Sequence, residues 1–174
     1  MDMMTTEVIG KSSIGLCQDK SLPTGAYWLE CLFVLSAKAE KSMQLARFLP
    51  PTPIKVCINT KLELEDKKFY KIESVRPKMG AQLINALRKQ IISALETAQV
   101  KAEELAITVK SERQQQMDSL LGDELARLQS LQKVNPAIRP EEISHLANQI
   151  DSLNGLISGA KLNLEAVRLV VNNP

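Results

Sequence analysis

The chain has 174 residues, of which 44% are hydrophobic and 24% are charged, a composition typical of a soluble globular protein with one core. Its 22 basic and 20 acidic residues give a formal net charge of +2, which is far from the dense positive field of most non-specific nucleic-acid binders. Aromatic residues make up only 3%, which removes the stacking platforms that most single-strand binders use.

The three cysteines, Cys17, Cys31 and Cys57, are odd in number and lie in apolar runs rather than in CxxC pairs. This pattern predicts reduced core thiols in a cytoplasmic protein rather than a disulfide framework or a zinc site. No apolar run reaches the roughly 18 residues that a membrane span needs. The N-terminus also lacks the charged-then-apolar order of a signal peptide. We therefore expect a cytoplasmic protein with no membrane partner.

Residues 8–78 are predicted to form mainly strands. Val8–Gly10 is compatible with a strand ahead of Ile14–Cys17, and the serine, proline and glycine of Asp19–Gly25 predict a turn. Tyr27–Ala37 is apolar at nearly every position. Such a strand is covered on both faces and belongs in the middle of a sheet.

Three prolines dominate the next stretch, at positions 50, 51 and 53. Proline excludes helix and central strand, so Arg47–Thr52 is predicted to be extended and to cross between two elements. Apolar and polar residues then alternate over Ile54–Asn59, which predicts a half-buried strand.

Lys61–Val75 is charged and alternates only weakly, so that a third strand and a short helix fit it equally well. Arg76–Lys78 is expected to interrupt any regular element. The predicted inward anchors of the charged stretch are Leu62, Leu64, Phe69 and Ile72.

A long helix is predicted over Gly80–Lys133, which contains no proline and one internal glycine, Gly122. It would be on the order of 80 Å long. Lys110–Gln116, with the sequence KSERQQQ, has no apolar residue and interrupts the apolar stripe, which resumes at Met117. The earlier part of the stripe recurs at steps of three and four and is expected to face a sheet: Ile84, Leu87, Ile91, Leu95, Ala98, Ala102, Leu105 and Val109.

Val134–Pro140 is predicted to be the turn of a helical hairpin, because Pro140 and the following acids are typical of a helix start. The second helix carries a heptad seam and ends at Ser158 and Gly159. Its expected partners across the hairpin are Leu131 with Ile143, Leu128 with Leu146, Leu125 with Ile150, Leu121 with Leu153 and Met117 with Ile157. This register brings the end of the second helix to KSERQQQ and explains why that part is polar.

These patterns together predict a single α+β domain over residues 1–174. Strands occupy mainly residues 8–78, the long helical hairpin occupies residues 80–158, and a strand over residues 162–171 returns to the sheet, since it is rich in β-branched residues. We expect a small antiparallel sheet packed on the base of the long helix, with the antiparallel helical hairpin protruding from it.

The sequence gives little support to catalysis. His145 is the only histidine and is expected to be a solvent-exposed helical residue without metal-binding partners. The adjacent acids Glu103 and Glu104 point in different directions on a helix and predict a solvated face. Neither GxxxxGK[ST] nor GxGxxG occurs. We therefore predict no catalytic, cofactor-binding or metal-binding residue in this chain.

Three stretches resemble one known family. They are MQLARFLPPTPIK over Met43–Lys55, LARLQSLQKVNPAIRPEE over Leu125–Glu142 and LNLEAVRLVV over Leu162–Val171. They are similar to the C-terminal region of the RapA family, bacterial RNA polymerase-associated ATPases of the SWI/SNF type. The resemblance covers nearly the whole chain in the same order, and RFLPPTP and VNPAIRPEE are its specific marks.

This resemblance implies that the chain is a fragment of a much larger, helicase-like translocase that binds core RNA polymerase and promotes its recycling. ATP and magnesium would be bound by two upstream RecA-like lobes, which agrees with the missing phosphate loop and leaves no cofactor for this region. The implied partners are the upstream ATPase domains and the polymerase core, whereas DNA has little support from this fragment.

The leading hypothesis is thus a non-catalytic accessory domain that serves interdomain packing or polymerase contact. One alternative is a nucleic-acid-binding module that uses the basic residues around the sheet, and another is a self-associating coiled-coil scaffold. The predicted partner-contact residues come from the two specific marks: Arg47, Pro50, Pro51, Asn135, Pro136, Arg139 and Pro140.

Overall fold

The computed structural model describes residues 11–174, which divide into two compact units. The sheet unit consists of the described part of Met1–Val34 together with Pro53–Leu105 and Leu162–Pro174. The hairpin unit consists of Leu35–Thr52 and Ala106–Lys161. The strand expected at Val8–Gly10 lies outside the described residues.

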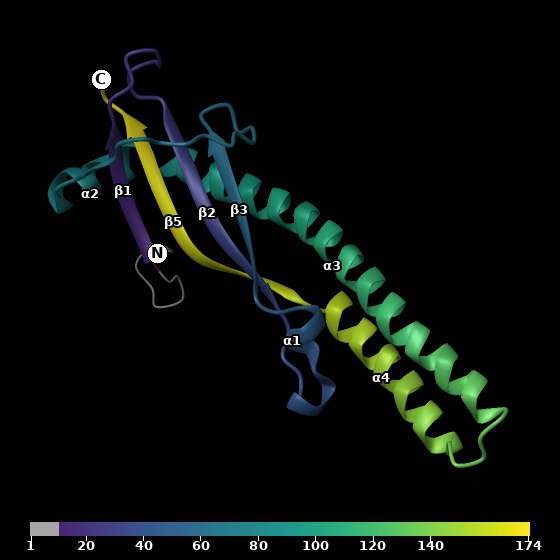
Figure 1. Ribbon diagram of the computed structural model, residues 1–174. Helices are drawn as coiled ribbons and strands as arrows, with labels where there is room; N and C mark the ends of the chain where they lie inside the picture. The colour runs from purple at the N-terminus through teal and green to yellow at the C-terminus, as the bar shows by residue number, and fades with distance from the viewer. Residues whose placement is uncertain (1–10) are drawn as a thin grey trace. The chain divides into compact units, whose positions relative to one another are not determined.

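Within residues 11–174 the sheet has five strands in the order β3-β2-β5-β1-β4. The strands are β1 (Lys11–Cys17), β2 (Tyr27–Ser36), β3 (Thr52–Asn59), β4 (Glu73–Ser74) and β5 (Lys161–Asn172). As predicted, β2 is an inner strand and the last strand returns to the sheet. The sheet is mixed rather than purely antiparallel, because β5 enters beside β1 and runs parallel to it. In Figure 1 the arrows of β1, β3 and β5 point the same way, and β2 runs against them.

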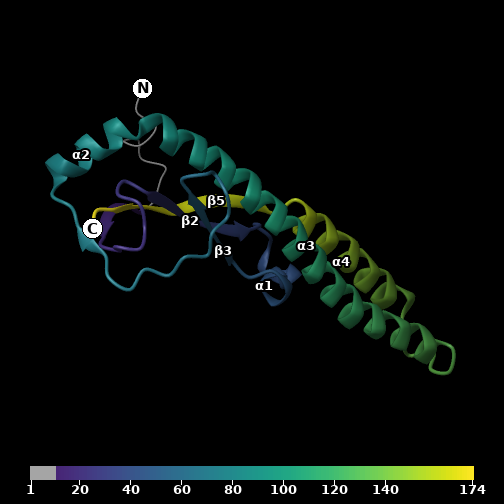
Figure 2. The same ribbon diagram turned by 90° about the horizontal axis from the view of Figure 1, so that it is seen from above.

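Two helices, and not one, follow the strands. α2 (Pro77–Ala86) and α3 (Arg88–Gln132) are separated at Leu87, whose backbone angles are φ −103 and ψ 11. The predicted start at Gly80 is wrong by three residues, since Pro77 opens α2 rather than interrupting it. Proline is tolerated there because the first turn of a helix does not need its N–H group. Figure 2 shows α2 and the beginning of α3 on one face of the sheet.

The core of the sheet unit lies between these helices and the sheet. The strands contribute fully buried side chains such as Leu29, Phe33 and Ile58. On α3 the buried line consists of one large residue and three alanines, whose small side chains let a helix approach a sheet closely: Ile91, Ala94, Ala98 and Ala102. Three of these four belong to the predicted stripe, but Leu105 does not, because it lies beside the contact line and is 42% exposed.

The other face of the sheet is crossed by residues 60–72, here called the crossing segment (Figure 2). It is irregular and forms only one bridge, Ile58 with Leu64, so the predicted third strand or short helix is wrong apart from the two residues of β4. Phe69 and Ile72 pack against the sheet as predicted. Leu62 and Leu64 do not, with exposures of 40% and 50%, because the chain turns on itself between them and β3.

The hairpin unit contains α1 (Leu45–Phe48), the part of α3 from Ala106 onward, and α4 (Pro140–Ser158). The prediction of an extended Arg47–Thr52 is wrong at its start, where Arg47 and Phe48 complete one helical turn. Buried residues of the two long helices agree with the predicted seam: Met117, Leu121, Leu146, Leu153 and Ile157. Leu131, near the open end, is 39% exposed.

Candidate partner interface

All seven predicted partner-contact residues lie in the hairpin unit and all are exposed. The structure does not bring them together. Arg47, Pro50 and Pro51 lie at α1, near the end of α4, and the other four lie at the turn between α3 and α4 (Figures 1 and 2). We call the first group the α1 turn and residues 131–142 the hairpin tip.

The α1 turn is fixed by its apolar side. Leu45 and Phe48, three residues apart, face inward with exposures of 6% and 4%, as expected for neighbours on one side of a helical turn. The guanidinium carbon of Arg47 lies 5.3 Å from the centre of the Phe48 ring, a cation–π arrangement. The helix ends at Leu49 because the residue before a proline avoids helical angles. Pro50 is therefore presented on the surface.

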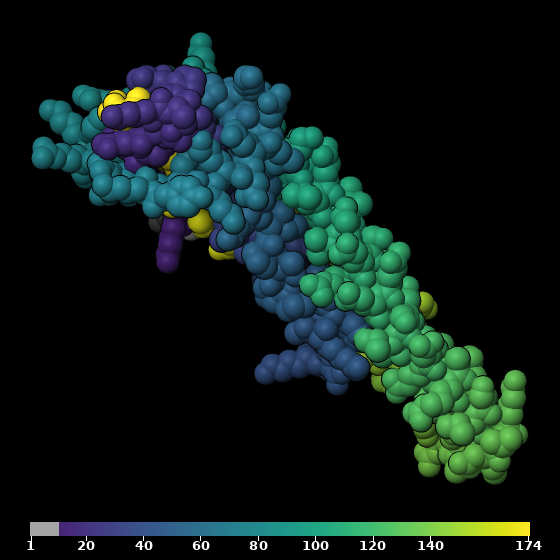
Figure 3. All heavy atoms as spheres, turned by 45° about the horizontal axis from the view of Figure 1, so that its top comes forward, coloured from purple at the N-terminus to yellow at the C-terminus, as the bar shows by residue number. Residues whose placement is uncertain are grey.

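The hairpin tip is held by local hydrogen bonds. The amides of Val134 and Asn135 donate to the carbonyl of Leu131, and the Asn135 side chain accepts from the amide of Ala137 at 3.0 Å. Pro140 then begins α4 with two acids in its first turn. These contacts do not cover the Val134 side chain, which is 80% exposed to solvent. Figure 3 shows the tip as an exposed, bright green group of atoms.

The polar stretch Lys110–Gln116 has a function that its composition does not reveal. The Lys110 ammonium donates to the Ser158 carbonyl at 3.1 Å, and the Gln114 amide donates to the Asn154 carbonyl at 3.2 Å and to the Ser158 hydroxyl at 2.7 Å. Ser158 is the last residue of α4, so its carbonyl is one of those that a helix end leaves without a helical partner, and Lys110 supplies that partner. The predicted register is consistent with these bonds, and the stretch closes the base of the hairpin.

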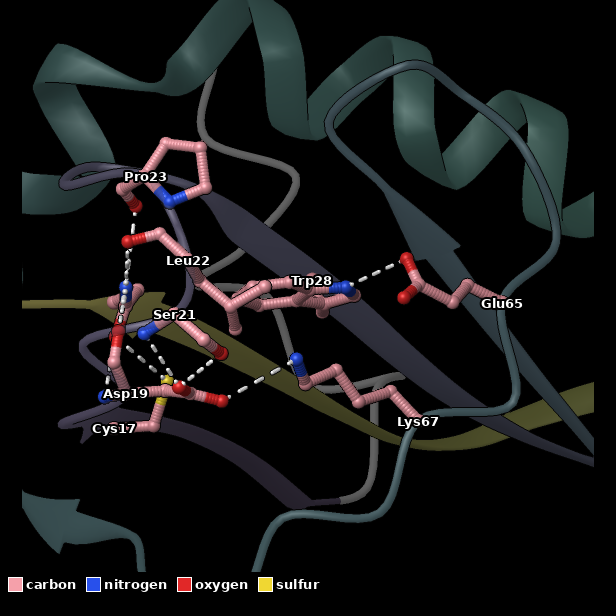
Figure 4. A network of polar contacts seen from close by, with 9 residues as sticks. Cys17, Asp19, Ser21, Leu22, Pro23, Trp28, Glu65 and Lys67 are labelled. Carbon is pink, nitrogen blue, oxygen red and sulfur yellow. Dashed lines mark hydrogen bonds and ion pairs between the residues drawn. The ribbon is translucent and has the colours of Figure 1, made fainter.

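A second polar cluster, which sequence reasoning missed, ties the crossing segment to the sheet (Figure 4). The indole of Trp28 donates to Glu65 at 3.0 Å, and the Lys67 ammonium lies 4.6 Å from the centre of the indole ring. The Phe69 ring meets the same indole edge to face at 5.5 Å. Because Trp28 is 3% exposed, one buried ring anchors three residues of the crossing segment.

Asn172 forms the centre of the neighbouring turn and is 1% exposed. Its amide nitrogen donates to the carbonyls of Asp19, Leu22 and Pro23 at 3.0 to 3.1 Å. Its oxygen accepts from the Asp19 amide at 3.0 Å and from the Cys17 thiol at 3.4 Å. The side chain thus closes the turn between β1 and β2 from the end of β5.

The thiols of Cys17 and Cys31 are buried, and that of Cys57 is half-buried. Burial raises the pKa of Cys31 to about 12 and that of Cys57 to about 11, so both stay protonated near neutral pH. A protonated thiol is a poor metal ligand and a poor nucleophile. Within residues 11–174 no three histidine, cysteine, aspartate or glutamate side chains are grouped so as to hold a metal ion. His145 is exposed on α4, as predicted.

A groove of about 700 Å³ lies on the sheet face that the crossing segment partly covers. Its charged residues are mixed in sign. Arg168 on β5 is paired with Glu30 on β2, and this hydrogen bond raises the pKa of the guanidinium. Further charges on the rim are Lys11, Lys55, Glu65, Asp66 and Lys67. The groove therefore has no dominant charge.

A family model described as "RNA polymerase recycling family C-terminal" matches residues 1–172. The chain belongs to this family. The RNA polymerase-associated protein RapA of Vibrio parahaemolyticus is 34% identical over 98% of the chain, and those of Photobacterium profundum and Vibrio campbellii are each 33% identical over the same share. The chain spans only 18% of the length of these relatives.

The family match includes the α1 turn and the hairpin tip, the two places that carry the specific marks RFLPPTP and VNPAIRPEE. No helix among the described residues combines the length and apolar character that crossing a membrane would require.

Proposed function

We propose that the chain is a non-catalytic accessory domain of an RNA polymerase-associated, ATP-dependent translocase. Membership of the RNA polymerase recycling family carries this proposal. Relatives that match almost the whole chain are named as RNA polymerase-associated proteins, and they are about five times longer than the match, as its 18% share implies. The remaining length has room for a motor, whereas this chain has no phosphate loop.

The hairpin tip is our candidate for the contact with RNA polymerase. It presents Val134 in the open, between the cations Lys133 and Arg139. The turn is already ordered by the Asn135 side chain and by its prolines, so little conformational entropy is lost when a partner binds it. The tip also carries the acids Glu141 and Glu142, so an exposed apolar side chain among charges of both signs fits an apolar socket with a mixed charged rim.

The α1 turn is our candidate for packing against the upstream ATPase domains. Pro50 and Pro51 are exposed and conformationally restricted, and the Pro50 carbonyl accepts from the Thr52 hydroxyl at 2.7 Å. Such a stiff extended segment can be bound at low entropic cost. Arg47 adds a charge beside it.

Site-specific photocrosslinking in the full-length parent protein tests both assignments. A photoreactive residue is placed at Val134, at Pro51 or, as a control, at the exposed Asp123 in the middle of the hairpin. We expect a crosslink to core RNA polymerase from position 134, a crosslink within the protein from position 51, and none from position 123. Normal polymerase binding without a crosslink from position 134 would exclude the tip.

The non-catalytic assignment is tested separately on the 174-residue chain. The purified chain is expected to hydrolyse no ATP, whether or not core polymerase is added. Robust hydrolysis that persists through purification would overturn the assignment.

A further inference from the structure

The strongest local concentration of positive charge in the chain begins within the crossing segment and continues to the start of α2. Residues 67–78 contain five basic residues and one acidic residue, whereas the whole chain has a net charge of only +2. The basic residues are Lys67, Lys68, Lys71, Arg76 and Lys78. Arg76 and Lys78 border the beginning of α2, which has no acid in its first turn, so the helix dipole adds to the positive potential.

Tyr70 projects from this charged stretch without any covering side chain, with a relative exposure of 101%. The residues around it explain its orientation. Phe69 and Ile72 are packed against the sheet, so the chain between them must turn outward. Figure 3 shows atoms of this part of the chain, coloured blue to teal, on the outer surface of the sheet unit.

The segment that carries the ring is held in place from beneath. Phe69, directly before Tyr70, meets Trp28 at 5.5 Å, and Trp28 is itself bonded to Glu65. Lys67 contacts the face of the same indole. An aromatic ring on an anchored backbone is a binding group that needs little further ordering.

Two lysines flank the ring and are available to a ligand. Lys68 is exposed and has no ion-pair partner among the described residues. Lys71 has only a surface pair with Glu73 at 3.6 Å, in which the lysine side chain is 81% exposed, and pairs of this kind contribute little. An open ring between two cations is the arrangement that binds a base together with its phosphates.

We propose that the crossing segment docks single-stranded nucleic acid, with one base stacked on Tyr70 and the adjoining phosphates bound by Lys68 and Lys71. A duplex does not fit this site equally well, because its bases are already stacked and cannot reach an exposed ring. The low aromatic content of the chain argued against an extended stacking platform, and this site needs only one ring. It lies in the sheet unit and is independent of the polymerase contact proposed for the hairpin tip.

Fluorescence anisotropy of a labelled 20-nucleotide single strand, with the 174-residue chain at several salt concentrations, tests the site. Tyr70→Ala should weaken binding about tenfold or more, the usual effect of losing one stacked base. Tyr70→Phe keeps the ring and should bind within about twofold. The double variant K68Q/K71Q should reduce the salt slope by about 1.4, or roughly 0.7 for each lost phosphate contact.

The control variant K38Q/K41Q removes two exposed lysines at the same spacing from the hairpin unit. It should leave both the affinity and the salt slope unchanged. Since Trp28 is the only tryptophan and touches Phe69, its emission shows whether the crossing segment is still docked in each variant. In the full-length parent protein, Tyr70→Ala should leave the crosslink from position 134 to core RNA polymerase unchanged.

Any of four results would overturn the site. They are no binding by the unmodified chain, equal binding by Tyr70→Ala, an equal loss in K38Q/K41Q, and a preference for duplex over single strand. The first and last concern the ligand, and the other two concern the residues.

Discussion

Asn172 shows how much of the sheet unit depends on a single polar side chain. It is buried at the end of β5, where it donates to three carbonyls and accepts from two donors of the β1–β2 turn. Fully satisfied buried polar groups fix a unique local structure, and their loss leaves partners that water cannot reach.

We predict that Asn172→Ala lowers the free energy of unfolding by about 1 to 3 kcal/mol, since it removes the hydrogen bonds of three carbonyls and an amide that are only partly open to water. Urea denaturation followed by Trp28 emission measures it. Asn173→Ala, at the exposed neighbouring position, should change stability by less than about 0.5 kcal/mol. Equal effects of the two substitutions would contradict the assigned role.

No sequence pattern pointed to Asn172. It ends an apolar strand as an ordinary polar residue, and its side-chain partners lie 149 to 155 residues earlier in the chain. Long-range partners of a buried amide leave no local signal. The exposure of His145 was predictable, in contrast, because a position one step off a heptad seam faces solvent.

Gly15 on β1 has no side chain, and this lets the crossing segment pack closely against the strand. A Cβ atom at Gly15 would lie 2.1 Å from Cγ2 of Ile72, far inside van der Waals contact. The glycine therefore lets the segment approach the sheet, and no turn geometry is involved. Ile72 is one of the two predicted anchors that the structure confirms.

Gly15→Ala is predicted to destabilise the protein by about 1 to 3 kcal/mol, because Ile72 or the segment must move. Gly155→Ala on α4 is a matched control, since nothing lies within 4 Å of its new methyl group. It should stabilise the helix by up to about 1 kcal/mol. Opposite signs in urea denaturation are the expected result, and a stabilising Gly15→Ala would contradict the close approach.

The elements that the sequence predicted well are those with a clear apolar pattern. β3, the distal part of α3, and α4 follow from alternation or heptads, and β2 follows from a run that is apolar at nearly every position. The break at Leu87 carries neither proline nor glycine, so nothing local marks it. α1 was missed because three prolines outweighed the apolar pair Leu45 and Phe48, although a single turn can end just before proline.

The candidate interface was predictable as a set of exposed residues but not as an arrangement. Its prolines and the turn at Asn135 follow from local rules, and all seven side chains are exposed. Their separation into two places depends on how the helices fold back. The choice of partner follows from the family and not from periodicity or charge.

At the scale of the whole molecule, both parts of the apolar stripe on α3 are covered by other residues of the same chain. Its base is buried in the sheet unit through Ile91 and Ala98, and its distal part is buried in the hairpin unit through Met117 and Leu121. A coiled-coil scaffold would need that stripe to be free. The burial argues against the self-association that the sequence left open.

We therefore predict that the chain sediments as a monomer at micromolar concentration. Leu153→Asp, which puts a charge at a fully buried position of the hairpin, should unfold or loosen the hairpin rather than dissociate an oligomer. A concentration-dependent dimer of the unmodified chain would contradict this prediction and revive the scaffold alternative.

The position of β5 has a consequence for biosynthesis. It is the last of the five strands in the sequence, yet it is an inner strand that lies between β2 and β1. The ribosome completes β2 at Ser36 and must add residues up to Asn172 before the sheet can close, which takes roughly 10 to 30 s at ordinary rates of translation. During this interval, both edges that await β5 are open to wrong pairing. The nascent chain should therefore depend on chaperones until its final strand has emerged.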